Sequence, residues 1–292
     1  MANSIALFKQ YVTLLDEVYK LAALSSRLDG AAELAQQGAN ANELIIPKIA
    51  MDGLAAYSRN GGYVGGDVTM TNETVACNFD RGRMFTVDAL DDAETAGIAY
   101  GRLASEFIRT KVVPELDAFR FATYAGTSSI STVSGAVLDT GDKVIAALRA
   151  ATNTMDENEV PMESRHLFIT PTLLGLVQDL DTTKSREVLA RFASVTTVPQ
   201  TRFYTSITQY DGTTSGQEAG GYIKTASTGK NINFLVVERS AVIQYQKHVA
   251  PKVVTPDQNQ TSDGWKFGYR NVGIADVYDN KVSGVYLHKS TS

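Results

Sequence analysis

The longest helical pattern in the sequence runs from about residue 92 to residue 124. Its inward-facing positions are apolar at helical spacing: Ile98, Leu103, Phe107, Val112, Leu116 and Phe119. A continuous helix of this length would be roughly 50 Å long at ~1.5 Å per residue. Asp91 and Glu94 stand at its start with the spacing of a capping box, and Gly126 marks its end. Pro114 removes one backbone donor, so we expect a bend there.

The N-terminal stretch also carries more apolar surface than its surroundings can cover. Residues 4–24 hold two apolar rows at helical spacing, and residues 25–43, which are small, polar and interrupted by Gly30 and Gly38, cannot cover them. Two arrangements stay open: an arm on a tether that docks away from its own linker, or a helix folded back on its own core. Together with the long helix, this surface exceeds what one core of 292 residues covers, which favours large contacts between copies of the chain.

Residues 44–88 have an apolar pattern of period two, which predicts strands around a long glycine-rich loop. In that loop, Gly61 and Gly66 have the G-x-x-x-x-G spacing of a phosphate-binding loop. Such a loop also needs Lys and then Ser or Thr, whereas this chain has Asp67, which repels phosphate, followed by Val68. We therefore interpret the glycines as the pliant tip of a hairpin, where turns with φ > 0 are needed.

The strands of this region contain one irregularity. The apolar row moves from Val68 and Met70 to Val75, Cys77 and Phe79, across Asn72 and Glu73. Because successive side chains of a strand point to opposite faces, this change of phase predicts a bulge or a tight turn.

The second half of the chain mixes helical and strand patterns after a Ser/Thr-rich connector at residues 127–135. We predict helices for "DKVIAALRAA", "PTLLGLVQDL" and "SREVLARFA", and strands for "HLFIT", "RFYTSIT" and "INFLVV". Residues 211–221 are predicted to form an exposed mobile loop. Residues 265–278 and 282–289, joined by "DNK", are predicted to form a terminal hairpin.

Composition and motifs argue against several functions. The net charge of −5 and the pI near 5.3 argue against a surface built to neutralise phosphates. The single cysteine, Cys77, rules out a disulfide framework and is interpreted as an isolated buried residue. None of His166, His248 and His288 has metal-ligand spacing, no serine lies in G-x-S-x-G, and we interpret His166 as structural. We expect no catalytic residue, cofactor, secretory signal or membrane span, while a triad assembled from distant parts of the chain stays open.

Two groups of charged residues have a structural and a functional interpretation. Asp88, Asp91, Asp92 and Glu94 could attract a divalent cation, but a helix N-terminus explains them more simply, so we expect no metal. Asp80, Arg81 and Arg83 could form a solvated turn. We favour instead arginine–carboxylate pairing with another element or another chain, a task for which lysine is a poor substitute.

Three stretches in succession, "IPKIAMDGLAAYSRNGGYVGGDVT", "FDRGRMFTVDALDDAET" and "EFIRTKVVPELDAFRFATYAG", strongly resemble the major capsid proteins of tailed bacteriophages with the Hong Kong 97-type fold. The closing stretches "NFLVVERSAVIQYQKHVAPKVV" and "WKFGYRNVGIADVYDNKVSGVYLHK" resemble the C-terminal part of the same family. The match covers most of the chain in order, and its specificity lies in the succession of motifs rather than in any single one.

The resemblance implies an α+β architecture. Its parts would be an N-terminal arm (1–43), an extended β-hairpin loop (44–90), the long spine helix with the start of a peripheral domain (91–135), an axial domain (136–240) and a return to the peripheral domain (241–292). The extended loop would lie over a neighbouring subunit. A long two-stranded ribbon is only marginally stable alone, so such a hairpin needs a surface to lie on.

The resemblance also implies a non-catalytic structural protein that forms pentamers and hexamers of an icosahedral phage head around double-stranded DNA, which it binds without sequence specificity. Its location would be the virion, and the host cytoplasm during assembly. Implied partners are other copies of the chain, a separate scaffolding protein, a portal and a decoration protein. The residues expected at subunit interfaces are Tyr57, Arg59, Tyr63, Asp67, Asp80, Arg81 and Arg83.

Some family members cross-link a loop lysine to an asparagine of a neighbour. The absence of lysine between Asp52 and Asp88 argues against that cross-link here. Two alternatives stay open: an encapsulin-like nanocompartment shell and, from another class, a small-molecule-binding α/β enzyme.

Overall fold

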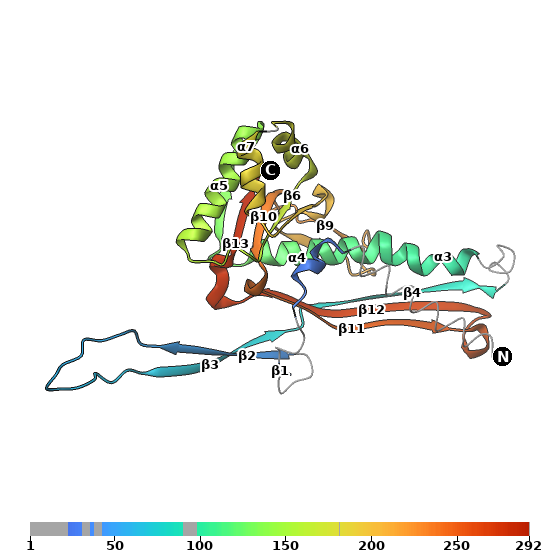
Figure 1. The fold of residues 1–292 in the computed structure, drawn as a ribbon. Helices are drawn as coiled ribbons and strands as arrows, with labels where there is room; N and C mark the ends of the chain where they lie inside the picture. Colours follow the sequence, from blue (N-terminus) through green and yellow to red (C-terminus); the bar gives the residue numbers. More distant parts are fainter. Residues whose placement is uncertain (1–22, 31–35, 38–42, 90–97, 181, 292) are drawn as a thin grey trace.

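The computed structural model describes residues 23–30, 36–37, 43–89, 98–180 and 182–291. The chain has an α+β fold in which a long hairpin projects from a body built of a helix lying along a sheet, and a second sheet covered by helices rises from that body (Figure 1). The predicted N-terminal helix, up to residue 22, and the predicted cap at Asp91 and Glu94 lie outside the described residues.

A three-stranded antiparallel sheet in the order β11–β12–β4 forms the base of the body. Its strands are β4 (Phe79–Asp88), β11 (Val242–Val254) and β12 (Gly264–Val277). The long helix lies along this sheet (Figure 1). Buried apolar side chains of both fill the space between them: Phe79, Ile108, Val113, Leu116, Phe267 and Tyr269.

The long helix confirms its predicted pattern from residue 98 onward and ends at the predicted glycine. It consists of α3 (Ile98–Phe107), a π-helical segment (Ile108–Val112) and α4 (Val113–Gly126). The N–H of Val113 bonds to the carbonyl of Ile108, five residues back. Since Pro114 has no N–H and crowds the Thr110 carbonyl, the irregularity that it imposes is this wider turn. No helix among the described residues is long and apolar enough to cross a membrane.

The second sheet is five-stranded and mixed, in the order β5–β13–β10–β6–β7, with β5 parallel to β13 and β6 parallel to β7. Its strands are β5 (Ser131–Ser134), β6 (Arg165–Ile169), β7 (Ser194–Thr197), β10 (Ile232–Glu238) and β13 (Val285–Lys289). The helices α5 (Gly141–Glu157), α6 (Pro171–Asp179) and α7 (Thr183–Ala190) cover one face, confirming the three predicted helices. On the other face, α4 packs through Phe121 and Tyr124.

Two local predictions about this half of the chain are wrong. The closing segments form no hairpin with each other, because the 3-10 segment Asp279–Gly284 carries the chain from β12 into the other sheet, where β13 pairs with β10 and β5. The strand predicted for "RFYTSIT" shrinks to β8 (Ile207–Gln209), which pairs with β9 (Tyr222–Lys224), because Phe203 turns into the core. The Ser/Thr-rich connector contains β5.

The projecting hairpin consists of β2 (Glu43–Met51) and β3 (Val68–Ala76), with the short β1 (Gln36–Gln37) beside β2. Its register runs unbroken from Glu43↔Ala76 to Met51↔Val68, so the predicted bulge is wrong. The apolar row changes phase because the outer half of the hairpin has no core beneath it: Val68 is 70% exposed, whereas Val75 packs on the body. After Asn78 the chain enters β4, which pairs with β12 rather than with the hairpin.

Residues 23–30 dock on the long helix through the 3-10 turn Leu24–Leu28. The fully buried carboxylate of Asp117 accepts hydrogen bonds from the N–H groups of Leu24 and Ser25, both 3.1 Å, and from the Ser25 hydroxyl at 2.7 Å. Leu28 is fully buried in the core. Of the two arrangements left open for the N-terminal stretch, a free tether does not describe residues 23–30, because a distant carboxylate satisfies the polar groups of Leu24 and Ser25.

Candidate assembly interface

The tip of the hairpin, residues 52–67, is a folded turn. Ser58 and Gly62 exchange two backbone hydrogen bonds of 3.2 and 2.8 Å, and Gly62 has a φ of +75°, as expected of a glycine at such a turn. This turn brings together the rings of Tyr57 and Tyr63, whose centroids lie 5.0 Å apart. The sequence therefore predicted correctly that glycines shape the tip around a tyrosine.

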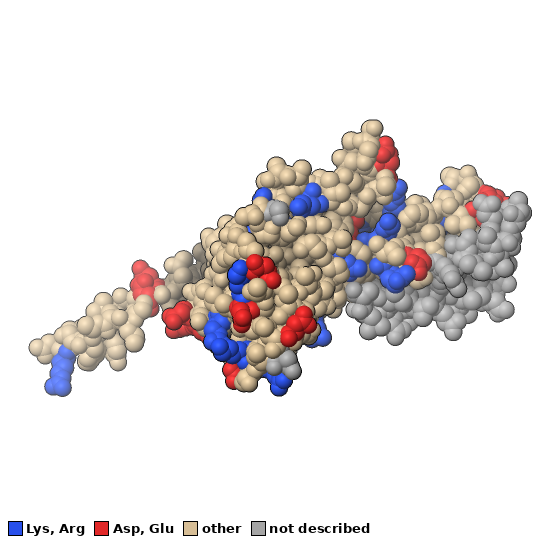
Figure 2. Space-filling view, turned by 90° about the horizontal axis from the view of Figure 1, so that it is seen from above, with Lys and Arg blue, Asp and Glu red and all other residues tan. Residues whose placement is uncertain are grey.

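The hairpin displays most of the large apolar side chains that are exposed in the described part of the molecule. They are Ile49, Met51, Leu54, Tyr57, Tyr63, Val64, Val68 and Met70. Tyr63 is 90% exposed, and Leu54 is fully exposed. In Figure 2 most charged side chains gather on the body, while the projecting hairpin shows a basic group at its end, an acidic group nearer the body and an uncharged surface between them. An apolar patch of this extent is typical of a surface that contacts another protein.

The root of the hairpin is fixed to the body by an apolar cluster and by charge. Leu44 of β2 and Val75 of β3 pack against Ile243 and Ile274. Beside them, Lys48 Nζ lies 2.8 Å from Glu73 on the facing strand and 2.6 Å from Asp279. Hydrogen bonds to Asp279 and Glu73 raise the pKa of Lys48, so the amine stays charged. Contacts at the root thus set the direction in which the tip points.

The predicted interface residues of β4 have partners within the chain. Arg81 Nε donates to Glu115 of α4 at 2.7 Å, and Arg81 Nη2 donates to the Tyr210 carbonyl at 2.7 Å. Asp80 pairs with Arg270 through bonds of 2.9 and 2.6 Å, which lower the pKa of Asp80. We expected Arg81 to pair with a carboxylate either on another element of its own chain or on another chain. In the structure its partner is Glu115, on another element of the same chain.

Arg83 holds the loop formed by residues 211–221. Its Nη2 donates to the Glu218 carbonyl at 2.9 Å. Gly212 and Gly220 have φ values of +77° and +67°, and a Cβ at either position would lie 3.0 Å from Arg83 Nη1. Inside the loop, hydrogen bonds from Thr214 and Thr213 hold the pKa of Asp211 far below its usual range. As predicted, most of this loop is exposed, and β4 fastens it to the body.

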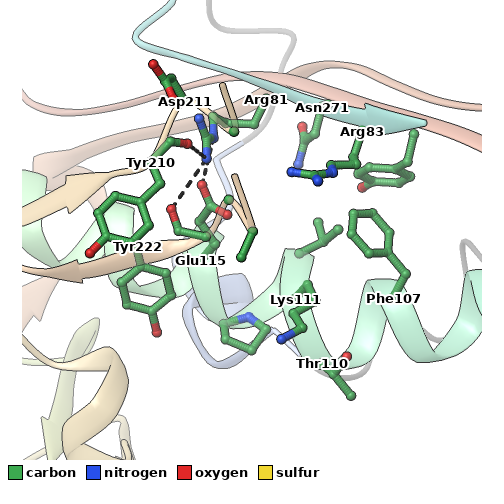
Figure 3. A pocket seen from close by; sticks show the side chains of 18 of the residues that line it. Arg81, Arg83, Phe107, Thr110, Lys111, Glu115, Tyr210, Asp211, Tyr222 and Asn271 are labelled. Carbon is green, nitrogen blue, oxygen red and sulfur yellow. Dashed lines mark hydrogen bonds and ion pairs between the residues drawn. The ribbon is translucent and has the colours of Figure 1, made fainter. Parts of the chain in front are cut away.

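A groove of about 900 Å³ lies between β4, the long helix and this loop. In Figure 3 the labelled side chains converge on it from three directions: Arg81, Arg83 and Asn271 from the sheet, Phe107, Lys111 and Glu115 from the helix, and Tyr210 and Tyr222 from β8, β9 and their loop. Burial raises the pKa of Tyr222 to about 12, so its hydroxyl stays protonated and donates to the Thr201 carbonyl at 2.9 Å. The groove thus combines aromatic walls with charged and hydroxyl groups.

The structure separates the predicted interface residues into two places: Tyr57, Arg59, Tyr63 and Asp67 on the hairpin tip, and Asp80, Arg81 and Arg83 on β4. The sequence prediction missed Glu115, the partner of Arg81, and the tyrosines of the groove. Glu115 could have been predicted as a candidate partner, since the motif V-V-P-E-L-D places it on the predicted long helix. Tyr210 and Tyr222 reach the groove only through the fold.

The remaining residues considered as candidate sites have structural partners. His166 Nδ1 lies 2.7 Å from the Ser194 hydroxyl on the neighbouring strand, which agrees with a structural role. His288 is buried and stacks on Phe234. Burial lowers the pKa of both histidines. Cys77 is a free thiol and is half-buried rather than buried.

No family model and no curated protein sequence matches the chain. Solved structures do match it. A structure from Gordonia phage Cozz is 11% identical with a TM-score of 0.59, covering 92% of this chain and 87% of that one. The capsid structure of cyanophage P-SCSP1u is 14% identical with a TM-score of 0.57, covering 88% and 86%. The virus-like particle from Pyrococcus furiosus is 8% identical with a TM-score of 0.57, covering 93% and 98%.

These likenesses extend over most of the chain in both phage structures and in the virus-like particle. The chain therefore has the Hong Kong 97-type capsid fold, as its sequence resemblance implied.

Proposed function

We propose that this chain is the major capsid protein of a tailed bacteriophage. In this role it assembles through pentamers and hexamers into an icosahedral head that encloses double-stranded DNA. The observation that carries the proposal is the projecting hairpin, whose apolar side chains have no core of their own to cover them. A neighbouring subunit would bury them, and their transfer from water would stabilise the contact by about 25 cal/mol per Å².

The shape of the molecule allows copies to join in a ring. The hairpin projects from one side of the body, so the surface that it presents differs from the surface that receives it (Figure 1). Such head-to-tail contacts repeat around an axis and close into rings when the rotation allows. The acidic net charge of −5 suits an inner wall against which DNA packs without adhering.

A second candidate function is that of a nanocompartment shell protein enclosing proteins. The virus-like particle from Pyrococcus furiosus favours it, since the match covers 98% of that chain. The contents of particles distinguish the two functions: a phage head packages DNA, and a nanocompartment retains a protein cargo. A separate scaffolding protein, a portal and a decoration protein are the partners expected for the phage head alone.

Expression of the chain, followed by size-exclusion chromatography and negative-stain electron microscopy, tests the proposal. We expect hollow closed particles or capsomer rings. Serine at Leu54, Tyr63 and Val64 together should abolish them without lowering the melting temperature of the subunit, because these side chains are exposed in it. A wild-type chain that remains a monomer or a discrete small oligomer would contradict both shell functions.

A further inference from the structure

We infer that the groove beside β4 receives the hairpin tip of the adjacent copy, with Tyr57 and Tyr63 inside it. This inference rests on the proposed function and names the surface that the tip meets. It follows from the chemistry of the tip, the size and lining of the groove, and the direction of the hairpin.

The tip presents side chains suited to a half-polar cavity. The packed rings of Tyr57 and Tyr63 offer apolar faces with a hydroxyl at the end of each, and Leu54 adds a fully exposed aliphatic group. The two backbone hydrogen bonds between Ser58 and Gly62 hold the turn between the rings, so that little conformational freedom is lost when the rings are buried. Tyrosines on a preformed turn are typical of the few side chains that dominate a protein contact.

The groove matches these groups in size and chemistry. Its volume of about 900 Å³ lies near the upper end of the ~300–1,000 Å³ found for binding pockets, which leaves room for more than one aromatic ring. Phe107 and Pro114 offer apolar surface, while Tyr210 and Tyr222 can stack on an incoming ring. Arg81 and Arg83 of β4 bond to the carbonyls of Tyr210 and Glu218 and so form a clasp that fixes this wall of the groove against β4.

Charge at the rim complements the tip. Arg81 is neutralised by Glu115, and Glu106 is paired with Arg109. Lys111 also lines the groove, and among the described residues no carboxylate pairs with it. The tip carries Asp52 and Asp67 at its base and Arg59 between them, so an incoming tip offers two anions to this cation at the rim.

The occupant must come from another copy. In Figure 1 the hairpin extends away from the body on the side opposite to α3, whereas the groove lies between α3, α4 and β4. A tip therefore points away from the groove of its own chain. One copy that inserts its tip into the next, and receives a tip in turn, forms the repeating contact that a ring requires.

Photo-cross-linking tests the contact. Tyr63→p-benzoylphenylalanine keeps an aromatic ring at an exposed position, and copies carrying it are co-assembled with ¹⁵N-labelled copies. We expect cross-links from residue 63 to residues 79–85, 103–115 or 201–224 of a labelled copy. The same analogue at Leu54 repeats the measurement if the first variant assembles poorly, and at the exposed Val137, outside the hairpin and the groove lining, it serves as the control.

A pair of matched variants tests the groove itself. Ala219→Trp fills its mouth, whereas Ser215→Trp places the same ring on the same exposed loop away from the lining. We expect the first to lower the cross-link yield about tenfold and the second to leave it unchanged. Particles of normal appearance that carry the analogue at residue 63 and whose cross-links map to other segments, such as β11, overturn the contact alone. A wild-type chain that forms no particles refutes the proposed function and the contact with it.

Discussion

Replacement of Asp117 measures how firmly residues 23–30 are held on the long helix. Its fully buried carboxylate accepts three hydrogen bonds from Leu24 and Ser25 and lies 3.3 Å from Arg202 Nη1. Arg120, which is 2% exposed, donates to the same Ser25 hydroxyl at 2.8 Å. Asp117→Ala removes the anion at the centre of this network and leaves its donors behind.

The structure gives a large expected cost for this substitution. Removal of one partner from a buried ion pair costs about 3–5 kcal/mol, and each buried donor left without an acceptor costs about 1–3 kcal/mol. The Arg202 side chain is 23% exposed and can turn toward water, so the loss of its contact with Asp117 contributes less to the destabilisation. We expect Asp117→Ala to lower the free energy of unfolding by about 3–5 kcal/mol, and Asp117→Asn, which keeps the shape and one acceptor, by about 1–3 kcal/mol.

Urea unfolding of the isolated subunit, followed by the fluorescence of Trp265 and by circular dichroism, measures the effect. The midpoint should fall while the dependence on urea stays the same. Asp139→Asn is the control, since it breaks only an exposed pair with Lys143 and should not shift the midpoint measurably. A loss below about 1 kcal/mol for Asp117→Ala would refute the idea that this carboxylate anchors the segment.

Three further substitutions probe other parts of the fold. Arg81→Lys cannot reach Glu115 and the Tyr210 carbonyl at once, so thermal unfolding should show a loss of about 0.5–1.5 kcal/mol. Gly82→Ala places a Cβ 2.8 Å from the Tyr269 carbonyl oxygen, so we expect a loss of about 1–3 kcal/mol and faster amide exchange in β4. The urea midpoint of the wild type should fall between pH 7 and pH 5, and in His288→Gln it should fall less steeply.

The sign of the pH effect follows from burial. Because burial lowers the pKa of His288 in the folded state, the unfolded chain takes up the proton first as the pH falls below about 6.5. Stability is therefore present above this pH and is lost between it and the lower pKa of the folded state, by up to ~1.4 kcal/mol per pH unit. His248→Gln, at an exposed position, is the control, and an unchanged slope in His288→Gln would contradict the assignment.

The other two substitutions have a control variant for Gly82→Ala and a contradicting outcome for Arg81→Lys. At Gly65 no atom beyond the adjoining residues lies within 4 Å of the position that a Cβ would take, so Gly65→Ala should leave stability unchanged where Gly82→Ala lowers it. For Arg81→Lys, a stability equal to that of the wild type would show that the clasp adds nothing to the subunit.

Local patterns predicted the elements of this fold better than their pairing. From Leu103 onward the predicted apolar row of the long helix faces the sheet, with Leu116 buried and the other members partly buried, because one helix face meets one sheet and the 3.6-residue period records that contact. The terminal hairpin failed because β12 and β13, although close in sequence, belong to different sheets: β12 lies between β11 and β4, whereas β13 lies between β10 and β5. Only the three-dimensional fold determines such pairings.

The candidate interface was predictable where its residues lie close in sequence. Glycines and tyrosines identified the hairpin tip, because a tight turn and an exposed aromatic pair need adjacent residues. The groove was not predictable, since its walls come from three distant segments. The sequence also contained evidence for the role of Asp117, which the prediction did not use. Asp117 shares a helix face with Val113, Phe121 and Tyr124, which are all fully buried. A carboxylate in such a row requires a polar partner.

The exposed hairpin has a kinetic consequence for the free subunit. Until a neighbour covers it, the chain carries a long two-stranded ribbon with apolar side chains and, on β3, an edge that pairs with no other described strand. Such an edge also attracts wrong partners, so ordered growth competes with aggregation for every newly folded copy. In the proposed assembly, the outcome depends on the concentration of the chain and on how soon a correct neighbour arrives, so the supply of newly folded chain would control the quality of the particle.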